Sequence, residues 1–456
     1  MSKISGTQPP LHFIEPNFDL KSYYLSKLIL PFRIRFATPI RKIQFENIEI
    51  LSDLYTKFSQ KKVRLLIAFR HPNANDPYLL GAIFWKLLPN YFKKNNIRIN
   101  DITHFHFVWD RGIPLWAGEK TGNFYSKLGG TPIHRGKVDW KGLNSIRNLF
   151  VNGRFPLAIA PEGATNGHNE ILSPLEPGIG QMALWCLEDL EKKNRNEEVY
   201  ILPLGIQYSY IDPNWKKLET LLDEFLKDLN INTVTENIYL SQEFDSEKNR
   251  IYSKLYSIGI SLLNIIEIFY KKYYGVFTQN DSTLPLQERL QNLLSNILSV
   301  SEKFFQISPK GTIIDRCRKL EQASWNWIYR DDIPEDISNL DKNLLDRIAV
   351  ESKEMDWHMR IVESFVAVNG HYVKDKPTFE RFSDVSFLFF DLISKIKTGS
   401  GQQRPTLGKY KVTLKAGDPI LVNPYYYLHK QGRAGTKKAV DEILVVLENK
   451  MNSLIN

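Results

Sequence analysis

Apolar and polar residues alternate along the first half of the chain in a way that predicts strands followed by helices. The uninterrupted apolar run from Leu65 to Phe69 is typical of a buried strand, and apolar residues between Leu79 and Leu87 recur at helical spacing. Further strands are expected at 105–109, 131–134, 157–160 and 199–207, and further helices at 115–128, 140–151 and 178–193. This alternation predicts an α/β fold with a mixed, mostly parallel sheet flanked by helices.

The pattern becomes purely helical after about residue 211. Apolar residues repeat at helical spacing in the segments 215–228, 251–274, 286–297, 312–329, 340–365 and 383–397. Stripes of this kind are what a helical bundle packing on itself requires. A stretch rich in Gly, Ser and Gln, residues 397–405, is then expected to be a linker or hairpin. Beyond it, residues 410–422 predict a strand, a turn and a second strand, and residues 436–451 predict a helix.

The segment from Leu20 to Phe36 mixes basic side chains with leucines and aromatic residues. This composition suits a helix that lies in a membrane interface. The alternative is a helix packed on the domain that follows, and the sequence does not decide between the two. Pro31 is expected to divide the segment into two helices, because proline breaks the interior of a helix. In the later strand at 199–207, Pro203 suggests an edge position or a bulge.

His71 and Asp76 flank the turn between the first predicted strand and its helix. Ligands of α/β proteins usually bind beyond the carboxyl ends of the strands, so this turn is a candidate site. Residues five apart point to different sides of a continuous helix but can meet through a turn. A carboxylate on one ring nitrogen of His71 would fix its tautomer and suit it to deprotonate a substrate hydroxyl. Alternatively, Asp76 followed by Pro77 simply begins the helix as a capping residue.

The pair His71-x4-Asp76 resembles the His-x4-Asp motif of the glycerolipid acyltransferases, which include the 1-acylglycerol-3-phosphate and lysophospholipid acyltransferases. Three further blocks resemble that family's motifs and follow in its order, namely residues 129–136, 160–166 and 201–206. Four blocks in order within about 140 residues are far more specific than one His-x4-Asp pair. The third block has the Glu-Gly-x-Thr-Asn form, which is closer to family members whose acceptors carry larger head groups.

The resemblance implies an O-acyltransferase of bacterial type that acts in phospholipid biosynthesis. It would move a fatty acyl group from an acyl thioester to the free hydroxyl of a lysophospholipid, most readily 1-acylglycerol-3-phosphate to give phosphatidate. Acyl carrier protein or coenzyme A would be the co-substrate, with no metal and no bound cofactor. Two alternatives stay open: an acyl-ester hydrolase that uses water, and a non-catalytic module that binds a lipid or a partner protein.

The resemblance also assigns roles to residues. His71 would be the general base and Asp76 would orient it, while Arg135 would grip the acceptor's phosphate, although a surface ion pair is its plainer explanation. The other residues expected to bind substrate are Gly130, Glu162, Gly163, Thr165, Asn166 and Pro203.

The resemblance suggests the domain organisation as well. The strand, turn and final helix after residue 405 are similar to the segment that closes the acyltransferase domain. We therefore expect an N-terminal helical segment at 1–62, an acyltransferase core at 63–210, a large all-helical insertion at 211–405 and a C-terminal part at 406–456 that completes the core.

Charge and composition narrow the partners and the location. A net charge of +9 over 456 residues favours an acidic partner such as an anionic membrane surface or a phosphorylated lipid. Nucleic acid is not expected, because the basic residues form no tract and no recognisable motif. We find no signal peptide and no uncharged apolar run of the roughly 18 to 20 residues that span a bilayer. These features predict a cytoplasmic protein that associates peripherally with a membrane.

The remaining candidates for special chemistry have plain explanations. Cys186 and Cys317 lie in predicted helices, which favours buried free thiols in a reducing compartment. The residues His104, His106, His168 and Glu170 lack the spacing of a metal site.

Overall fold

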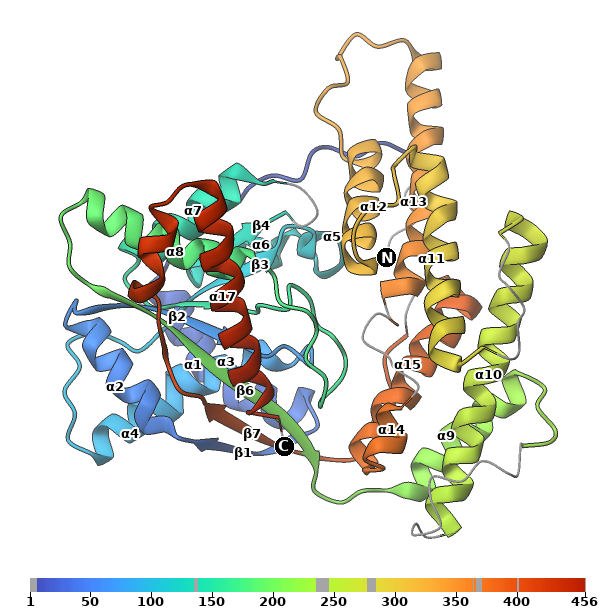
Figure 1. Ribbon diagram of the computed structural model, residues 1–456, viewed down its shortest axis with the longest axis horizontal. Coiled ribbons are helices and arrows are strands. Elements are labelled where there is room, and N and C mark those ends of the chain that lie inside the picture. The colour runs from blue at the N-terminus through green and yellow to red at the C-terminus, as the bar shows by residue number, and fades with distance from the viewer. Residues whose placement is uncertain are drawn as a thin grey trace. The chain divides into compact units, whose positions relative to one another are not determined.

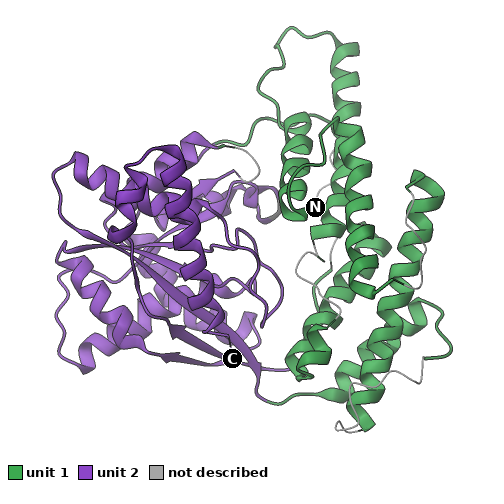
Figure 2. Cartoon of the chain, in the orientation of Figure 1, with its two compact units in different colours: residues 1–12, 135–138, 212–407 green, residues 13–134, 139–211, 408–456 purple. Residues whose placement is uncertain are grey.

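The computed structural model describes residues 6–134, 138–234, 246–276, 284–363, 365, 371–399 and 402–455. The chain divides into two compact units (Figure 2). One unit, residues 13–134, 139–211 and 408–456, contains the sheet. The other, residues 1–12, 135–138 and 212–407, is helical in its described parts. Each unit is described by itself below.

The first unit is built around an eight-stranded sheet with the order β1-β7-β6-β2-β5-β3-β4, and β8 also pairs with β6 (Figure 1). The strands are β1 Ile40–Glu46, β2 Val63–Phe69, β3 His106–Asp110, β4 Gly130–Ile133, β5 Leu157–Ile159, β6 Glu198–Tyr210, β7 Tyr410–Ala416 and β8 Ile420–Leu421. The five strands from β2 to β6 are parallel to their neighbours among themselves, whereas β7 and β8 run antiparallel to β6. The predicted mixed, mostly parallel sheet is confirmed.

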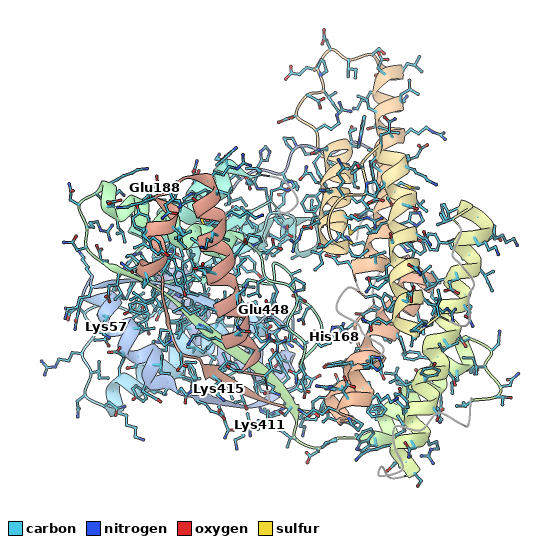
Figure 3. All side chains as sticks on the ribbon, in the orientation of Figure 1. Lys57, His168, Glu188, Lys411, Lys415 and Glu448 are labelled. Atoms are coloured by element: carbon cyan, nitrogen blue, oxygen red, sulfur yellow. The ribbon has the colours of Figure 1, made fainter. Side chains whose placement is uncertain are left out.

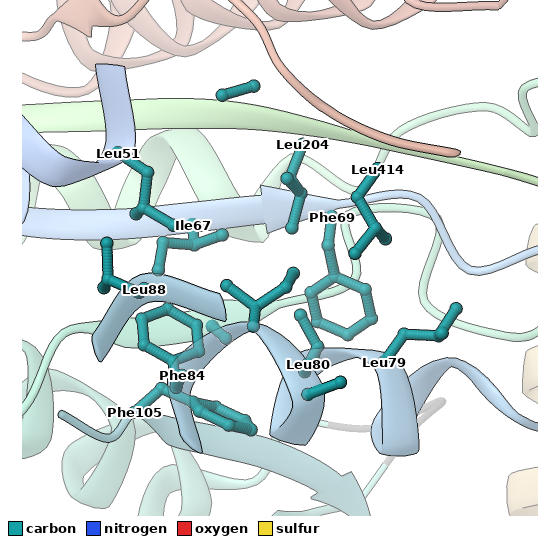
Figure 4. Close-up of a cluster of buried hydrophobic side chains, with 14 of the residues drawn as sticks. Leu51, Ile67, Phe69, Leu79, Leu80, Phe84, Leu88, Phe105, Leu204 and Leu414 are labelled. Atoms are coloured by element: carbon teal, nitrogen blue, oxygen red, sulfur yellow. The ribbon is translucent and has the colours of Figure 1, made fainter. Parts of the chain in front are cut away.

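Helices cover both faces of the sheet. Because side chains alternate along a strand, Leu65 and Ile67 of β2 pack into one buried cluster and Leu66 and Ala68 into another. The helices over the first face are α1 Leu20–Ala37, α2 Ile48–Ser59, α3 Asp76–Ala82, η1 Ile83–Leu87 and α4 Leu88–Lys94. The main helices over the second face are α7 Trp140–Asn152, α8 Gly178–Lys192 and α17 Arg433–Asn452. Figure 4 shows side chains of the first cluster between β2 and the helices from α3 to α4.

Burial on both faces explains why β2 reads as a continuous apolar run. Every residue of β2 is buried, which is typical of a central strand in a parallel sheet. Short helices, α5 Ile113–Ala117, α6 Glu119–Lys127 and α16 Tyr426–His429, complete the unit. The single helix expected at 115–128 is interrupted at Gly118, whose φ of +88° is a conformation that glycine adopts readily.

The expectation that Pro31 would split the N-terminal segment into two helices is wrong. Helix α1 is continuous from Leu20 to Ala37 with Pro31 inside it. A proline removes one main-chain hydrogen bond, and the packing of α1 compensates for this loss. Tyr23 and Leu30 of α1 are buried in the first cluster, and a Cβ on Gly81 of α3 would lie 3.0 Å from Leu30 Cδ2. The two helices are therefore in close contact.

Pro203 lies in β6, between β2 and β7 and in continuous register with β2, so the expected edge position or bulge is wrong. Gly417 N donates to Pro203 O at 2.9 Å, which places the main-chain polar groups of Pro203 on the side of β7 and β8. At that point β7 has ended at Ala416 and β8 begins only at Ile420. The missing N–H of Pro203 therefore faces the turn between two strands and costs the sheet no ladder hydrogen bond.

The second unit contains a set of helices that pack on one another. These are α9 Trp215–Asp228, α10 Ser246–Tyr274, α11 Leu286–Phe305, α12 Ile313–Ile328, α13 Asn339–Glu363, α14 Tyr372–Asp375 and α15 Phe379–Thr398. Their apolar stripes face inward, and a buried ion pair joins Arg316 to Glu302. Within the described residues, α10 is long and apolar enough to cross a membrane by length and composition. However, 56% of the 18-residue apolar stretch that meets this criterion is buried inside the protein.

The pairing of β3 with β4 generates a prediction for Gly130. Gly130 lies opposite Phe107, and a Cβ on Gly130 would lie 2.6 Å from two atoms of the Phe107 ring. We expect Gly130→Ala to lower the free energy of unfolding by about 1–3 kcal/mol through overpacking, as measured by urea denaturation. Gly178→Ala is the control, because no atom lies within 4 Å of its added Cβ. Equal effects of the two substitutions would contradict the packing explanation.

Candidate functional site

The first and third sequence blocks meet at the carboxyl edge of the sheet. Strands β2 and β5 are parallel neighbours, with Leu66 opposite Leu157. The segments that follow them therefore leave the sheet side by side, one with His71 and the other with Glu162. This edge is where parallel α/β sheets place their ligand sites.

His71 and Asp76 meet through the turn after β2, as the spacing predicted. His71 Nδ1 lies 2.9 Å from Asp76 Oδ2, and the His71 side chain is 20% exposed while that of Asp76 is fully buried. Because a carboxylate only accepts, we assign the proton to Nδ1, which leaves a lone pair on Nε2. The N-cap residue of α3 is Asn75, so the alternative in which Asp76 caps the helix is not what the structure shows.

Two more donors hold the Asp76 carboxylate. Asn73 N donates to Oδ2 at 2.9 Å, and Tyr208 Oη donates to Oδ1 at 2.5 Å. Burial and the adjacent Asp76 raise the pKa of Tyr208 well above its ordinary value, so Tyr208 remains a protonated donor. Together with His71 Nδ1, these donors give the Asp76 carboxylate three hydrogen bonds and hold it in one orientation.

Sequence reasoning missed Tyr208. It lies on β6 at 132 positions from Asp76, on the strand face that also carries the buried Leu204 and Ile206. The alternation of β6 was a usable signal, because it predicts that Tyr208 points into the same core. Knowing that this core reaches Asp76 requires the order of the strands, with β6 next to β2.

Arg70 was missed as well. Its guanidinium is buried and donates to three main-chain carbonyls, those of Asn169 at 2.6 Å, His168 at 3.3 Å and Ile171 at 2.5 Å. The Asn169 side chain in turn exchanges two hydrogen bonds with the main chain of Tyr208. Arg70 and Asn169 thereby fix the loop after β5 between β2 and β6.

Glu162 joins the loop after β5 to His71. His71 N donates to Glu162 Oε1 at 3.1 Å, while Asn166 Nδ2 and Ser173 N donate to Oε2 at 2.6 and 2.9 Å. Asn166 N also donates to His71 O at 3.2 Å. The Glu162 side chain is buried, so in this arrangement both of its oxygens organise the loop.

Thr165 lies within hydrogen-bond distance of His71, the candidate general base. Its Oγ1 lies 2.8 Å from His71 Nε2, and Thr165 is exposed. Since Nε2 carries the lone pair, the Thr165 hydroxyl donates to it. The three side chains of Asp76, His71 and Thr165 thus form a continuous line of hydrogen bonds that ends at the protein surface.

The other predicted residues lie in the turn after β5 and in strands β4 and β6. Gly163 has a φ of +71°, and its N donates to Ala160 O within the turn after β5. Gly130 is buried within β4, and Pro203 is buried within β6. Arg135 lies outside the described residues, so its expected role stays a prediction.

His104 and His168, two histidines considered above as metal ligands, make hydrogen bonds within the fold. His104 Nδ1 accepts from Trp85 Nε1 at 3.0 Å and Nε2 donates to Leu128 O at 2.9 Å, and burial lowers the pKa of His104 to about 3. His168 (Figure 3) is buried, with Nδ1 2.8 Å from Asn166 O. Across the described ranges, no group of three or more His, Cys, Asp or Glu side chains could hold a metal ion. Cys186 and Cys317 are free and buried, as predicted.

Comparisons of the chain with protein families, with curated proteins and with solved structures found no match.

The buried carboxylate generates a prediction for Tyr208. We expect Tyr208→Phe to lower the free energy of unfolding by about 1.5–3 kcal/mol, because it removes a hydrogen bond to a charged buried group. Urea denaturation measures this loss. In an Asp76→Ala background the same substitution should cost much less, since the acceptor is gone. An equal cost in both backgrounds would show that Tyr208 acts through packing alone.

Proposed function

We propose that the protein is an O-acyltransferase that moves a fatty acyl group from an acyl thioester to the free hydroxyl of a lysophospholipid. The preferred acceptor in this proposal is 1-acylglycerol-3-phosphate, which gives phosphatidate. The observation that carries the proposal is the state of His71, whose Nδ1 faces a buried carboxylate and whose Nε2 faces a hydroxyl. A histidine held in this way is suited to take a proton from an alcohol.

The chemistry follows from this arrangement. The acceptor's hydroxyl gives its proton to His71 Nε2 as its oxygen attacks the thioester carbonyl. Asp76 stabilises the imidazolium that forms, and its own donors keep it in place. The carbon–sulfur bond then breaks, and the imidazolium returns the proton to the leaving thiolate. Acyl-coenzyme A or an acyl carrier protein supplies the thioester, and the chain's own residues need no further cofactor for these steps.

The four sequence blocks support the choice of reaction. They resemble those of the glycerolipid acyltransferases in kind and order, and the first and third of them lie together at one edge of the sheet. In this proposal Arg135 binds the acceptor's phosphate. Glu162 and Asn166 hold the loop that receives the head group against His71, and Gly163 closes the turn in which this loop begins.

Helix α1 supports a membrane location for the acceptor. The large apolar side chains that α1 exposes are Leu20, Tyr24, Leu25, Leu28, Ile29, Phe32 and Phe36. The helix also carries four basic residues and no acidic one, which suits an anionic lipid surface. We propose that α1 rests in the membrane interface of the cytoplasmic side.

The position of α1 within its unit connects this surface with the site. Arg33 Nε donates to Tyr78 Oη at 3.0 Å, and Tyr78 is the third residue of the helix that begins with Asp76. Leu30 packs at Gly81 on the same helix. A membrane-bound α1 would therefore hold the His71 turn close to the lipids that carry the acceptor.

The first test of the proposal replaces the base. We expect His71→Ala to lower acyl transfer from labelled acyl-coenzyme A or acyl carrier protein to lysophosphatidate by about 10²–10⁴-fold, because general-base catalysis is lost. The control is His429→Ala, which should leave transfer unchanged. His429 is a half-buried histidine of the same unit, and its ring forms a hydrogen bond with Thr436. Thermal unfolding of both variants checks that they are folded.

The other outcomes of this assay identify other functions. An active, folded His71→Ala variant would end the general-base assignment. Free fatty acid released without any acceptor would identify an acyl-ester hydrolase. Folded wild-type protein that gives no product with any lysophospholipid would favour a non-catalytic module that binds a lipid or a partner.

A separate test concerns α1. We expect the double substitution Phe32→Glu and Phe36→Glu to weaken sedimentation with phosphatidylglycerol vesicles by at least about tenfold. The substitution removes apolar area that would enter the membrane, and it adds two negative charges that the anionic lipid repels. The control is Tyr427→Glu with Val445→Glu, two exposed apolar residues on α16 and α17 over the opposite face of the sheet. Equal loss in both double variants would show that α1 is not the membrane contact.

A further inference from the structure

The hydroxyl of Thr165 occupies the position on His71 that a substrate hydroxyl must take. General-base catalysis requires the acceptor's O–H to reach the lone pair on His71 Nε2. In the structure, Thr165 Oγ1 already lies 2.8 Å from that nitrogen. The acceptor can therefore reach the base only after the Thr165 side chain has moved away.

Hydrogen bonds of the neighbouring residues hold the loop that carries Thr165 beside His71. The next residue, Asn166, donates its N–H to His71 O at 3.2 Å and its side-chain amide to Glu162 Oε2 at 2.6 Å. Glu162 in turn accepts from His71 N at 3.1 Å. The loop is thus bound to His71 on both sides of the Thr165 position. The Thr165 side chain itself is exposed, so a rotation about its χ1 angle can release the hydroxyl while the loop stays in place.

We propose that Thr165 is a specificity-determining residue that protects the acyl thioester from hydrolysis. This inference rests on the acyltransferase function proposed above. A hydroxyl tethered beside Nε2 competes with water for the base, because it makes the same hydrogen bond without the entropy cost of capturing a free molecule. Water is therefore not activated while the acceptor is absent.

The lysophospholipid displaces Thr165, whereas water does not. The acceptor brings binding energy from its head group and acyl chain, which offsets the loss of the Thr165 contact. Water has no such additional contacts.

The Thr165 hydroxyl is also a secondary alcohol, so the space at Nε2 accommodates this type of group. The free hydroxyl of 1-acylglycerol-3-phosphate is of the same type.

The test compares Thr165→Val, which keeps the shape and removes the hydroxyl, with Thr165→Ser, which keeps the hydroxyl. Each purified full-length protein is incubated with acyl-coenzyme A, with and without 1-acylglycerol-3-phosphate. Thiol release measures total turnover, and labelled lipid product measures transfer. We expect the ratio of hydrolysis to transfer to rise about fivefold in Thr165→Val, the effect of losing one hydrogen bond, and to stay near the wild-type ratio in Thr165→Ser. Thr165→Ala serves as a second variant without the hydroxyl if Thr165→Val is unstable.

Two results would overturn the inference. An unchanged ratio in a folded variant without the hydroxyl, Thr165→Val or Thr165→Ala, would show that Thr165 does not exclude water. A mass increase of one acyl group on the wild-type protein, absent from Thr165→Val, would show instead that Thr165 attacks the thioester and forms an acyl-enzyme. If the proposed acyltransferase function is itself wrong, the result is different, because the wild-type protein then transfers no acyl group to any lysophospholipid.

Discussion

The site depends on one buried charge, the Asp76 carboxylate. A carboxylate without solvent is costly unless donors surround it, and Asp76 has three, two from its own turn and one from the distant strand β6. Asn73 N fixes the turn after β2, Tyr208 Oη ties that turn to β6, and His71 Nδ1–H orients the imidazole so that Nε2 is left to accept a proton. The same carboxylate thus sets the fold of the turn and the tautomer of the histidine, which is why chemistry and local stability are inseparable at this edge of the sheet.

The second support of His71 comes from the opposite side, through the loop after β5. Glu162 and Asn166 make hydrogen bonds with the main chain of His71, and the Arg70 guanidinium donates to main-chain carbonyls at the end of the loop. These residues are largely buried, so their polar groups stabilise geometry more than they offer contacts to solvent. A histidine clamped by two loops needs little reorganisation when a proton arrives, which is the property that a general base requires.

Local patterns in the sequence predicted most of the elements, because each depends on a few neighbouring residues, but the segment 1–62 was expected to be helical and contains strand β1, Ile40–Glu46. The apolar run of β2 and the His71–Asp76 turn could be read without knowledge of the rest of the chain. Tyr208 and the contact of Thr165 with His71 could not, since both depend on β6 and β5 being the neighbours of β2. Rules for proline failed for a related reason: the packing around Pro31 and the strand ends beside Pro203 are tertiary features.

The order of the strands has a consequence for how the protein is made. The first strand of the sheet, β1, lies at its edge with β7 as its neighbour, and β7 follows β6 after roughly 200 residues. During synthesis β1 therefore waits for a partner until almost the whole chain has emerged, while the side of β6 that will bind β7 is also open. A nascent chain with two unpaired strand edges is prone to wrong pairing and aggregation. Early folding of the helical unit would speed the pairing of β7 with β6 once β7 has emerged, because a compact connection has less chain entropy left to lose.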